Sequence, residues 1–459
     1  MHLKEGVAMF KWLERYISSL TPQRGIFLYY LIALVLASAL LSLPVLYRGE
    51  KETALIDTIF VATSALSVTG LTSVNIAETF NTFGYIAIML ILNLGGIGIM
   101  AVGTMVWVLF GRRIGLKERM QIAVDNNQYK FSGAVKLVIG IIKVLLVIEA
   151  VGAFMYVTYF LVETNDLYYS LMNGIFLSVS ATTNGGMDLF GDSLLGFEEA
   201  YILQVPVMIQ IMLGAIGYPV LIEARNYLSK HHKNFRFTLF AKITTVTYIG
   251  LFFLGTFFIF IMESQNYFAR DSWFKTMMNS MFASATTRSG GLTTVDPSLF
   301  NDATQLMMSA FMFIGASPSS AGGGIRTTTF AILILFLVAF SRGRTDIRIF
   351  NREIAKEDLH RAFAVITLAV FLVFGGVISI VLFEDSRFDM IDVIFEVSSA
   401  FGTCGLSTGI TDELSSPSKG VVMIFMLIGR IGFVSFLFSM AGRQKELPYH
   451  FPKERILIG

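Results

Sequence analysis

The sequence predicts an all-α polytopic membrane protein in which one helical unit is repeated four times around a central axis. The chain has 459 residues, of which 54% are hydrophobic and only 15% are charged, whereas soluble proteins carry about 25% charged residues. Runs of about 20 apolar residues, the length that spans a bilayer, recur along the whole sequence. A short hydroxyl-rich stretch that ends in glycine also recurs between these runs, which is typical of a repeated unit.

The recurring stretch places a glycine directly before an apolar residue. Its four copies end at Gly70, Gly186, Gly291 and Gly405. The spacing between these glycines is about 105 to 116 residues, which indicates one unit present in four tandem copies.

Each copy lies within the same order of segments: a long apolar run, a short segment, the glycine stretch and a second long run. The short segments have about 13 residues, too few for a bilayer that needs about 20, so each is expected to enter the membrane and stop. The first runs are expected at residues 26–47, 134–162, 237–262 and 362–383, the short segments at 54–67, 168–181, 272–285 and 390–400, and the second runs at 80–110, 200–228, 303–340 and 420–440. The sequence therefore predicts four helix–pore-loop–helix repeats around a central pore, with eight transmembrane helices and four re-entrant pore helices.

The basic residues predict the orientation and the boundaries of these units. They gather in the segments that join the repeats, and the positive-inside rule places such segments in the cytoplasm. The expected parts are an amphipathic cytoplasmic N-terminus (1–24), repeat 1 (25–111), a linker and repeat 2 (112–229), a linker and repeat 3 with an intramembrane loop (230–341), a linker and repeat 4 (342–440), and a cytoplasmic tail (441–459).

Four glycine loops around one axis can bind a cation through the main chain. Glycine adopts backbone angles that turn carbonyl groups toward an axis, and a ring of carbonyl oxygens replaces the water around a dehydrated cation. No carboxylate lies within the loops, which disfavours calcium or magnesium chelation. The expected ion-binding residues are Val68, Thr69 and Gly70; Asn184, Gly185 and Gly186; Ser289, Gly290 and Gly291; and Thr403, Cys404 and Gly405.

Two alternatives are open for these glycines. They could be contacts between helices, where glycine is common, although four copies in register fit that explanation poorly. The third filter glycine is also open between two residues, because counting from Ser284 and Ala285 favours Gly290, whereas the glycine–apolar pattern favours Gly291.

A second fourfold motif follows each glycine stretch by about 24 to 28 residues. Its copies contain Gly95, Gly214, Gly315 and Gly429. The first two copies are typical of close helix packing, where small residues let backbones approach. In the third copy, Pro318 and the glycines at 322–324 cannot sustain a regular helix. That span should therefore break into an intramembrane loop, with a passive kink as the alternative.

Charged residues at membrane depth are the remaining signal. Arg430 stands in the fourth copy where the others have glycine or alanine, and a charge at that depth costs several kcal/mol unless it faces a partner or water. We expect Arg430 to project into the permeation path and delay cations; carbonyl groups at helix ends could also satisfy it, and the two interpretations are compatible. Arg288 and Glu396 are expected to form a buried ion pair.

These residues resemble the membrane subunit of bacterial Trk/Ktr-type potassium uptake systems. The resemblance covers nearly the whole chain and is nearer to the Ktr branch (KtrB and KtrD), because the longer Trk branch has an additional N-terminal pair of spans. It is carried by the segments 69–71, 184–186, 288–291 and 401–406. It implies that the four glycines form a potassium filter, with Gly291 as the third. Gly70 implies potassium selectivity, since a serine there accompanies sodium permeation in some plant members.

The resemblance also implies a gate and several partners. It assigns the gate to the loop beneath the filter, that is, to Gly315, Ala316, Ser317, Pro318, Ser319, Ser320, Ala321, Gly322, Gly323, Gly324 and Ile325, together with Arg430. It implies a homodimer in the bacterial cell membrane, mounted on a cytoplasmic KtrA/KtrC-like ring of regulatory subunits. A nucleotide would bind that ring, because this chain has no phosphate loop.

Other functions fit the sequence less well. A sodium-coupled or sodium-permeable transporter of the same fold is the first alternative. A secondary carrier for a larger solute is a weaker one, because carriers usually have inverted or parallel repeats about a substrate site. The sequence has no nucleophile–base arrangement, no metal-spaced histidines and a single cysteine, so we expect neither an enzyme nor a nucleic-acid-binding protein.

Overall fold

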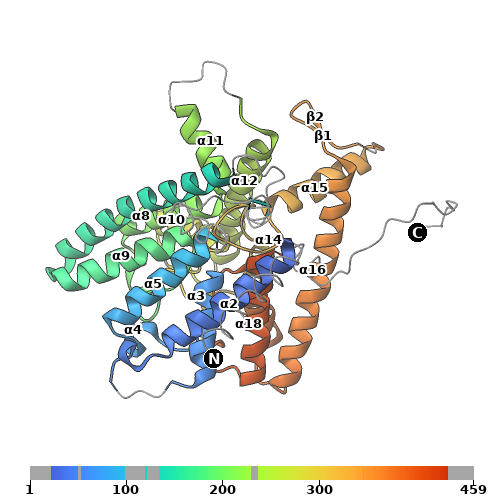
Figure 1. Cartoon of the computed structure of the whole chain (residues 1–459). Helices are drawn as coiled ribbons and strands as arrows, with labels where there is room; N and C mark the ends of the chain where they lie inside the picture. The colour runs from blue at the N-terminus through green and yellow to red at the C-terminus, as the bar shows by residue number, and fades with distance from the viewer. Residues whose placement is uncertain are drawn as a thin grey trace, which may run out of the picture.

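Helices make up most of the computed structural model, which describes residues 22–49, 53–98, 119–120, 134–228, 236–344 and 346–432 (Figure 1). In four successive segments, a long helix is followed by a shorter helix of 13 to 17 residues, a loop and a third helix. The first segment contains α2 (Pro22–Leu41), η1 (Pro44–Leu46), α3 (Leu55–Ser67), α4 (Ile76–Thr79) and α5 (Thr82–Ile97), and the second contains α8 (Ala134–Thr164), α9 (Leu167–Thr183), η2 (Leu195–Phe197), α10 (Tyr201–Ala215) and α11 (Tyr218–Leu228).

The other two segments follow the same order. The third contains α12 (Leu239–Glu263), α13 (Trp273–Thr286), η3 (Pro297–Leu299), α14 (Asp302–Ile314) and α15 (Thr327–Ser341), and the fourth contains α16 (Lys356–Phe383), α17 (Met390–Gly402) and α18 (Ser416–Ile431). A two-stranded antiparallel hairpin, β1 (Arg348–Ile349) and β2 (Arg352–Glu353), lies between the third and fourth segments. The hairpin and α11 lie toward the same end of the molecule, at the top of Figure 1.

Polar side chains determine where several of these helices begin. The Asn81 side chain accepts a hydrogen bond from the Phe83 amide at 2.9 Å, and the Asn301 side chain accepts one from the Thr304 amide at 2.9 Å. The Asp166 carboxylate caps α9 in the same way. Because the first amide groups of a helix have no partner within the helix, these caps stabilise the observed starting points.

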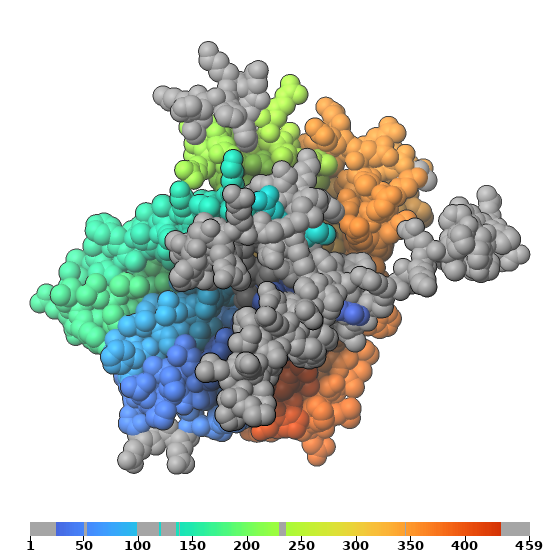
Figure 2. Space-filling view, viewed as in Figure 1, coloured from blue at the N-terminus to red at the C-terminus, as the bar shows by residue number. Residues whose placement is uncertain are grey.

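The four segments form a closed ring. The third helix of each segment packs against the shorter helix of the next: α5 against α9, α10 against α13, and α14 against α17. The last segment returns to the first, because α18 packs against α3. On the face shown in Figure 2, the first segment (blue) accordingly lies between the second (green) and the fourth (orange to red).

The long helices have the length and the surface of membrane spans. Among the described residues, four helices are long and apolar enough to cross a membrane, at Arg24–Leu41, Val138–Thr164, Leu239–Glu263 and Lys356–Phe383. A fifth span is possible if α10 and α11 are counted as one. Their large apolar side chains point outward, with Phe154, Val162, Phe371 and Leu382 at least 70% exposed. Such apolar surface suits lipid rather than water.

The third helices are less regular than the sequence predicts. The expected run at 200–228 is not one continuous helix, because α10 and α11 meet at an angle of 105°. Gly217, with φ of 103°, lies at the bend, and the amide of Tyr218 donates to the Ser319 carbonyl at 2.8 Å instead of continuing a helix. The expected break in the third copy is confirmed, since α14 ends at Ile314 and α15 begins at Thr327.

Several expected parts lie outside the described residues. They include nearly all of the amphipathic N-terminus (1–24), the cytoplasmic tail (441–459) and residues 99–110 and 433–440 of the second runs. Within the described part, α5 and α18 end at Ile97 and Ile431, and each is followed by a glycine with positive φ, Gly98 (95°) and Gly432 (86°). Within the described residues, the helices α5, α10, α14 and α18 therefore all end at the second motif.

Candidate functional site

The chain takes a left-handed conformation just after each of the four shorter helices. The φ angle is 57° at Val68, 59° at Asn184, 66° at Ser289 and 45° at Thr403. Residues other than glycine rarely adopt such angles. In the first, second and fourth stretches this residue directly follows the helix, and in the third it comes three residues after α13 ends at Thr286. In all four it lies two positions before the recurring glycine.

Two residues further on, each stretch reaches a glycine that also has a positive φ angle. The values are 101° at Gly70, 63° at Gly186, 72° at Gly291 and 93° at Gly405. Glycine takes these angles without the strain that a Cβ atom would add. The glycines are therefore required by the path of the backbone.

These four glycines are neighbours in space. A methyl group placed on Gly70 would lie 2.9 Å from the Cα of Gly186, and one placed on Gly186 would lie 2.8 Å from the Cα of Gly291. One on Gly291 would lie 2.7 Å from the carbonyl oxygen of Cys404, and one on Gly405 would lie 3.0 Å from the Cα of Gly70. The contacts run through the stretches in order and return to the first. The four stretches thus surround one axis.

The third stretch enters this ring through Gly291. A methyl group on Gly290 would meet Thr286 and Ile211, 2.8 and 2.9 Å away, and neither belongs to another glycine stretch. Gly290 also lacks the positive φ angle that the other three ring glycines share. By position in the ring, Gly291 is the counterpart of Gly70, Gly186 and Gly405.

Hydrogen bonds from the shorter helices hold the stretches in place. The Gly70 amide donates to the Ser64 hydroxyl at 3.0 Å, and the Gly405 amide donates to the Ser399 hydroxyl at 3.1 Å. In the second stretch, the Gly185 amide donates to the carbonyl oxygen of Ser180 at 2.7 Å. Because a buried amide group needs a partner, these bonds fix the direction in which each stretch leaves its helix.

The loop between α14 and α15 lies against the third and fourth stretches. A methyl group on Gly322 would be 2.5 Å from the hydroxyl oxygen of Ser289, and one on Gly323 would be 2.6 Å from that of Thr403. All eleven residues from Gly315 to Ile325 belong to this loop, and the Ala316 amide closes it with a 3.0 Å hydrogen bond to the Gly323 carbonyl. The loop therefore occupies the space directly next to the ring.

The end of α10 holds the other side of this loop. The Ser317 amide donates to the Ala215 carbonyl at 3.0 Å, and the Ala321 amide donates to the Gly214 carbonyl at 3.1 Å. These carbonyl groups belong to the last turn of α10, where no helical amide can reach them. Amide groups of the loop thus donate to carbonyls at the end of α10, and the Tyr218 amide after the bend donates to a carbonyl of the loop.

Arg430 joins the loop to the end of α5. One terminal nitrogen of its guanidinium donates to the Ala321 carbonyl, and the other donates to the carbonyls of Gly95 and, at 3.2 Å, Gly96. The side chain is buried. Carbonyl groups at helix ends therefore satisfy this charge, as one of the two sequence interpretations expects, and the arginine contacts the loop at the same time.

The comparison with protein families identifies this architecture. The model of the family described as "TrkH: Cation transport protein" matches residues 32–448. The chain belongs to the TrkH family. This agrees with the resemblance to Trk/Ktr-type membrane subunits found in the sequence.

Individual relatives of this TrkH-family chain match it over nearly its full length. It is 46% identical to the Ktr system potassium uptake protein D of Bacillus subtilis (strain 168), over 96% of this chain and 98% of that protein. It is 31% identical to the potassium/sodium uptake protein NtpJ of Enterococcus hirae, over 97% of this chain and 99% of that protein. The crystal structure of the potassium transporter TrkH from Vibrio parahaemolyticus shares the fold, with a TM-score of 0.71 and 17% identity over 92% of this chain and 86% of that one.

The expected ion pair between Arg288 and Glu396 is wrong. Glu396 accepts hydrogen bonds from the hydroxyl groups of Ser407, at 2.9 Å, and Thr411. The guanidinium nitrogens of Arg288 have no hydrogen-bond partner among the described residues, and the group lies 5.6 Å from the ring centre of Tyr248. Hydroxyl groups satisfy the carboxylate and an aromatic face stabilises the guanidinium, so neither charge requires the other.

Tyr218, which no sequence motif singled out, lies close to Arg430. Its buried hydroxyl donates to the Gly96 carbonyl at 3.0 Å, the same carbonyl that Arg430 contacts. The signal was the order Gly217, Tyr218, Pro219, because a proline favours the first turn of a new helix. It predicts the start of α11 at this point.

A second contact that the sequence did not reveal joins the ends of the TrkH-family chain. The Lys419 ammonium, in α18, lies 2.8 Å from the Asp57 carboxylate, in the first turn of α3. Both side chains are largely buried, with 9% and 16% exposed. Removing one partner of such an ion pair strongly destabilises the folded protein, because the other charge is then left buried without a partner.

We expect Lys419→Met to lower the free energy of unfolding by roughly 3 kcal/mol, since it strands the Asp57 carboxylate. Arg387→Met is the matched control, because its ion pair with Glu413 is more than half exposed on both sides and such pairs contribute at most about 1 kcal/mol. Thermal unfolding of the purified protein in detergent would measure both changes. Equal losses in the two variants would contradict this account of the Lys419–Asp57 pair.

Proposed function

We propose that the chain translocates potassium ions across the plasma membrane of a bacterial cell, along the axis that the four glycine stretches surround. One observation carries this proposal: Gly70, Gly186, Gly291 and Gly405 contact one another in a closed cycle at the ends of four short helices. The carboxyl ends of these helices bring negative dipole charge to that point, which favours a cation. The names of the two relatives above support potassium as the ion.

In this proposal the stretches act as a selectivity filter. The ion-binding oxygens are main-chain carbonyls of Val68, Thr69 and Gly70 and of the equivalent residues in the other three stretches, 184–186, 289–291 and 403–405. Gly291 is the third filter glycine, because Gly291 lies next to Gly186 and Cys404 in the ring, whereas Gly290 lies next to Thr286 and Ile211. Among the described residues, no cluster of three or more histidine, cysteine or acidic side chains could hold a metal ion.

The membrane arrangement follows from the same proposal. The four shorter helices, α3, α9, α13 and α17, are the re-entrant pore helices of four tandem repeats, and the flanking helices make up eight spans. The closed ring of helix contacts supports a central pore between the repeats. The basic linkers and both termini lie in the cytoplasm by the positive-inside rule.

The loop from Gly315 to Ile325 is the proposed gate, with Arg430 as its latch. The loop lies next to Ser289 and Thr403 and is therefore placed to block the end of the filter. Arg430 holds it to the end of α5 and adds a positive charge that repels cations. Opening requires that these hydrogen bonds break.

Regulation and assembly come from other chains in this proposal. The protein forms a homodimer on a cytoplasmic ring of nucleotide-binding regulatory subunits, and the nucleotide binds that ring. The name of the Bacillus relative, a potassium uptake protein of a Ktr "system", supports a transporter of more than one subunit.

The alternative is a transporter that also carries sodium or is coupled to it. The relative named as a potassium/sodium uptake protein favours this alternative, since it aligns with 97% of the chain. Ion preference therefore decides between the two functions.

Gly70→Ser is the decisive substitution. Its effect is measured as potassium and sodium uptake in a cell that lacks its own potassium uptake systems. A Cβ atom at Gly70 would lie 2.8 Å from the Gly185 carbonyl, and its φ of 101° strains any other residue. The first stretch must therefore shift, and we expect the preference for potassium over sodium to fall about tenfold, equal to roughly 1.4 kcal/mol.

Gly420→Ser is the control, because nothing lies within 4 Å of its added Cβ atom and its φ angle is ordinary. It should transport like the wild type. If the Gly70→Ser protein has normal abundance and an unchanged ion preference, the filter assignment is wrong. Wild-type protein that carries no potassium would refute the proposed function itself.

A further inference from the structure

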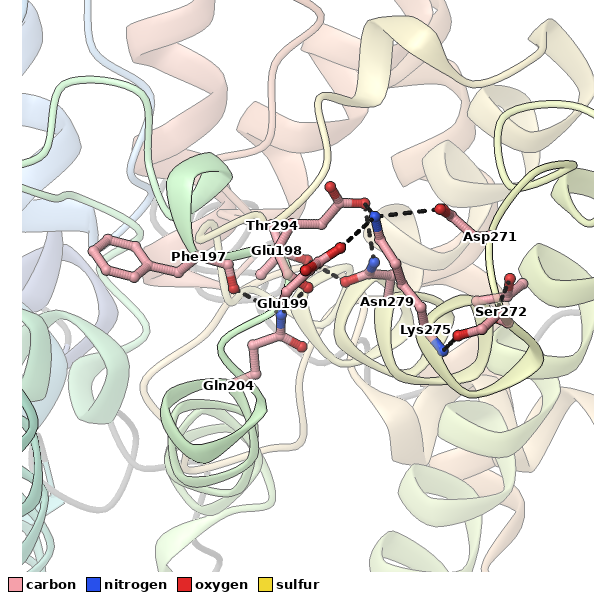
Figure 3. Close-up of polar contacts among 10 residues, drawn as sticks. Phe197, Glu198, Glu199, Gln204, Asp271, Ser272, Lys275, Asn279 and Thr294 are labelled. Carbon is pink, nitrogen blue, oxygen red and sulfur yellow. Dashed lines mark hydrogen bonds and ion pairs between the residues drawn. The ribbon is translucent and has the colours of Figure 1, made fainter.

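Lys275 is surrounded by three carboxylates at the start of α13. Its ammonium nitrogen lies 3.3 Å from an oxygen of Glu198, of Glu199 and of Asp271 (Figure 3). Asp271 precedes α13, whereas Glu198 and Glu199 lie between η2 and α10. Because the positive-inside rule places the basic linkers in the cytoplasm, the opposite ends of the segments are the expected outer side. The ion pairs thus join the second segment to the third on that side.

A second layer of the same network reaches toward the filter. One turn along α13, the Asn279 amide group donates to Glu198 at 3.2 Å and its oxygen accepts a hydrogen bond from the Thr294 hydroxyl at 3.2 Å. Thr294 follows Gly291 by only three residues. Glu198 therefore contacts α13 at two levels, and through Asn279 it is connected to the chain that leaves the third glycine stretch.

The turn that carries Glu198 is itself held firmly. The Gln204 side chain donates to the Phe197 and Glu198 carbonyls at 2.9 and 2.7 Å (Figure 3). Nearby, the Leu194 amide donates to the Thr293 carbonyl at 2.9 Å, which links the two segments a second time. A carboxylate on such a fixed turn can set the position of its partner.

The environment favours a strong contact. The side chain of Lys275 is 16% exposed and those of Glu198 and Asp271 are 24% and 23% exposed, whereas Glu199 is 75% exposed and contributes less. Burial alone would lower the pKa of Lys275, but the hydrogen bonds to Asp271 and Glu199 and the charge of Glu198 outweigh it, so the pKa is raised. Lys275 is therefore fully charged at physiological pH.

A comparison with α3 supports a role in placing the short helices. Asp57 is the third residue of α3, and Lys275 is the third residue of α13. Each forms its ion pair with a neighbouring segment, Asp57 with Lys419 and Lys275 with Glu198. The two short helices that lie on opposite sides of the ring are thus both fixed at their outer ends.

We propose that Lys275, Glu198 and Asn279 form an outer clamp that holds the third filter stretch against the second, and so contributes to ion selectivity. The proposal rests on the filter function above. Gly186 and Gly291, the two glycines that the clamp relates, are in direct contact. Because the clamp acts through α13 and Thr294 and does not touch the ion, Lys275 is a positioning residue.

The test compares potassium and sodium uptake by the full chain carrying Lys275→Met or Lys275→Arg, with protein abundance in the membrane measured in parallel. We expect Lys275→Met to reduce the potassium preference about fivefold or more, since coupled contacts of this kind influence one another strongly. Lys275→Arg should retain most of the preference, because it keeps the positive charge. Arg387→Met, which removes an exposed ion pair on the same predicted side, should leave the preference unchanged.

Each outcome separates the clamp from the filter itself. Wild-type potassium uptake together with an unchanged preference in Lys275→Met would overturn the clamp and leave the proposed function intact. If the wild-type protein takes up no potassium, the proposed function itself is refuted, and with it the clamp that rests on it. If Lys275→Met does not accumulate in the membrane, Glu198→Gln replaces it, because Lys275 then keeps Asp271 and Glu199; an unchanged preference in that variant would equally overturn the clamp.

Discussion

Replacing Gly405 with alanine should abolish potassium uptake. Its φ angle of 93° strains any residue with a Cβ atom, and the added methyl group would meet Gly70 and Gly291 at 3.0 and 3.1 Å as well as the carbonyl of Thr69. Backbone cannot yield as a flexible side chain can, so the fourth stretch must leave the ring. In the proposed filter all four stretches supply oxygens to the same ion, so we expect uptake to fall by about a hundredfold or more.

Gly409→Ala distinguishes the effect of backbone strain from the effect of a steric clash with the neighbouring stretches. Gly409 lies in the same loop with nearly the same φ angle, 96°, but nothing lies within 4 Å of its added Cβ atom. Its replacement should cost some stability and leave ion preference intact. Uptake measured per molecule in the membrane compares the two variants, and equal inhibition by both would show that backbone strain alone explains the loss.

Arg430→Met should increase uptake under conditions where the wild type is closed. The substitution removes the hydrogen bonds to Ala321 and to the end of α5, together with the positive charge beside the path. Hydrogen bonds from a charged group contribute about 1.5 to 3 kcal/mol each, so losing even one should shift the balance between closed and open states about tenfold. Uptake in the absence of any regulatory subunit is the measurement.

Arg387→Met provides the control for this experiment. It also removes one positive charge, but from an exposed ion pair with Glu413 that does not involve the loop. Uptake per folded molecule should remain at the wild-type level. A decrease in Arg430→Met, with normal abundance, would contradict the assignment of Arg430 as a latch.

Local chemistry explains why much of the ring could be predicted from sequence. The glycines at 70, 186 and 405 occupy positions where the backbone requires a positive φ angle, and that requirement is visible in the residue type. The third copy was ambiguous because Ala285 stands where the others have Ser64, Ser180 and Ser399, each six residues before its glycine. Counting from Ser284 therefore led to Gly290.

Tertiary contacts explain what the sequence could not provide. Arg288 and Glu396 looked like partners because both are charged and close to the filter, yet Arg288 lies beside the Tyr248 ring and Glu396 accepts a hydrogen bond from Ser407. The 105° bend after α10 depends on hydrogen bonds to a loop about 100 residues later. Pairings over such distances leave no periodic pattern in the sequence.

The contact between α18 and α3 has a consequence for how the molecule is made. Lys419 and Asp57 are 362 residues apart, so the ring closes only after almost the whole chain has been synthesised. Contacts between distant residues form late, because the intervening chain must first be ordered. A nascent chain with three segments in the bilayer would lack one wall of the proposed ion path. If the four stretches form the filter, a selective protein therefore exists only once the last helix has been completed.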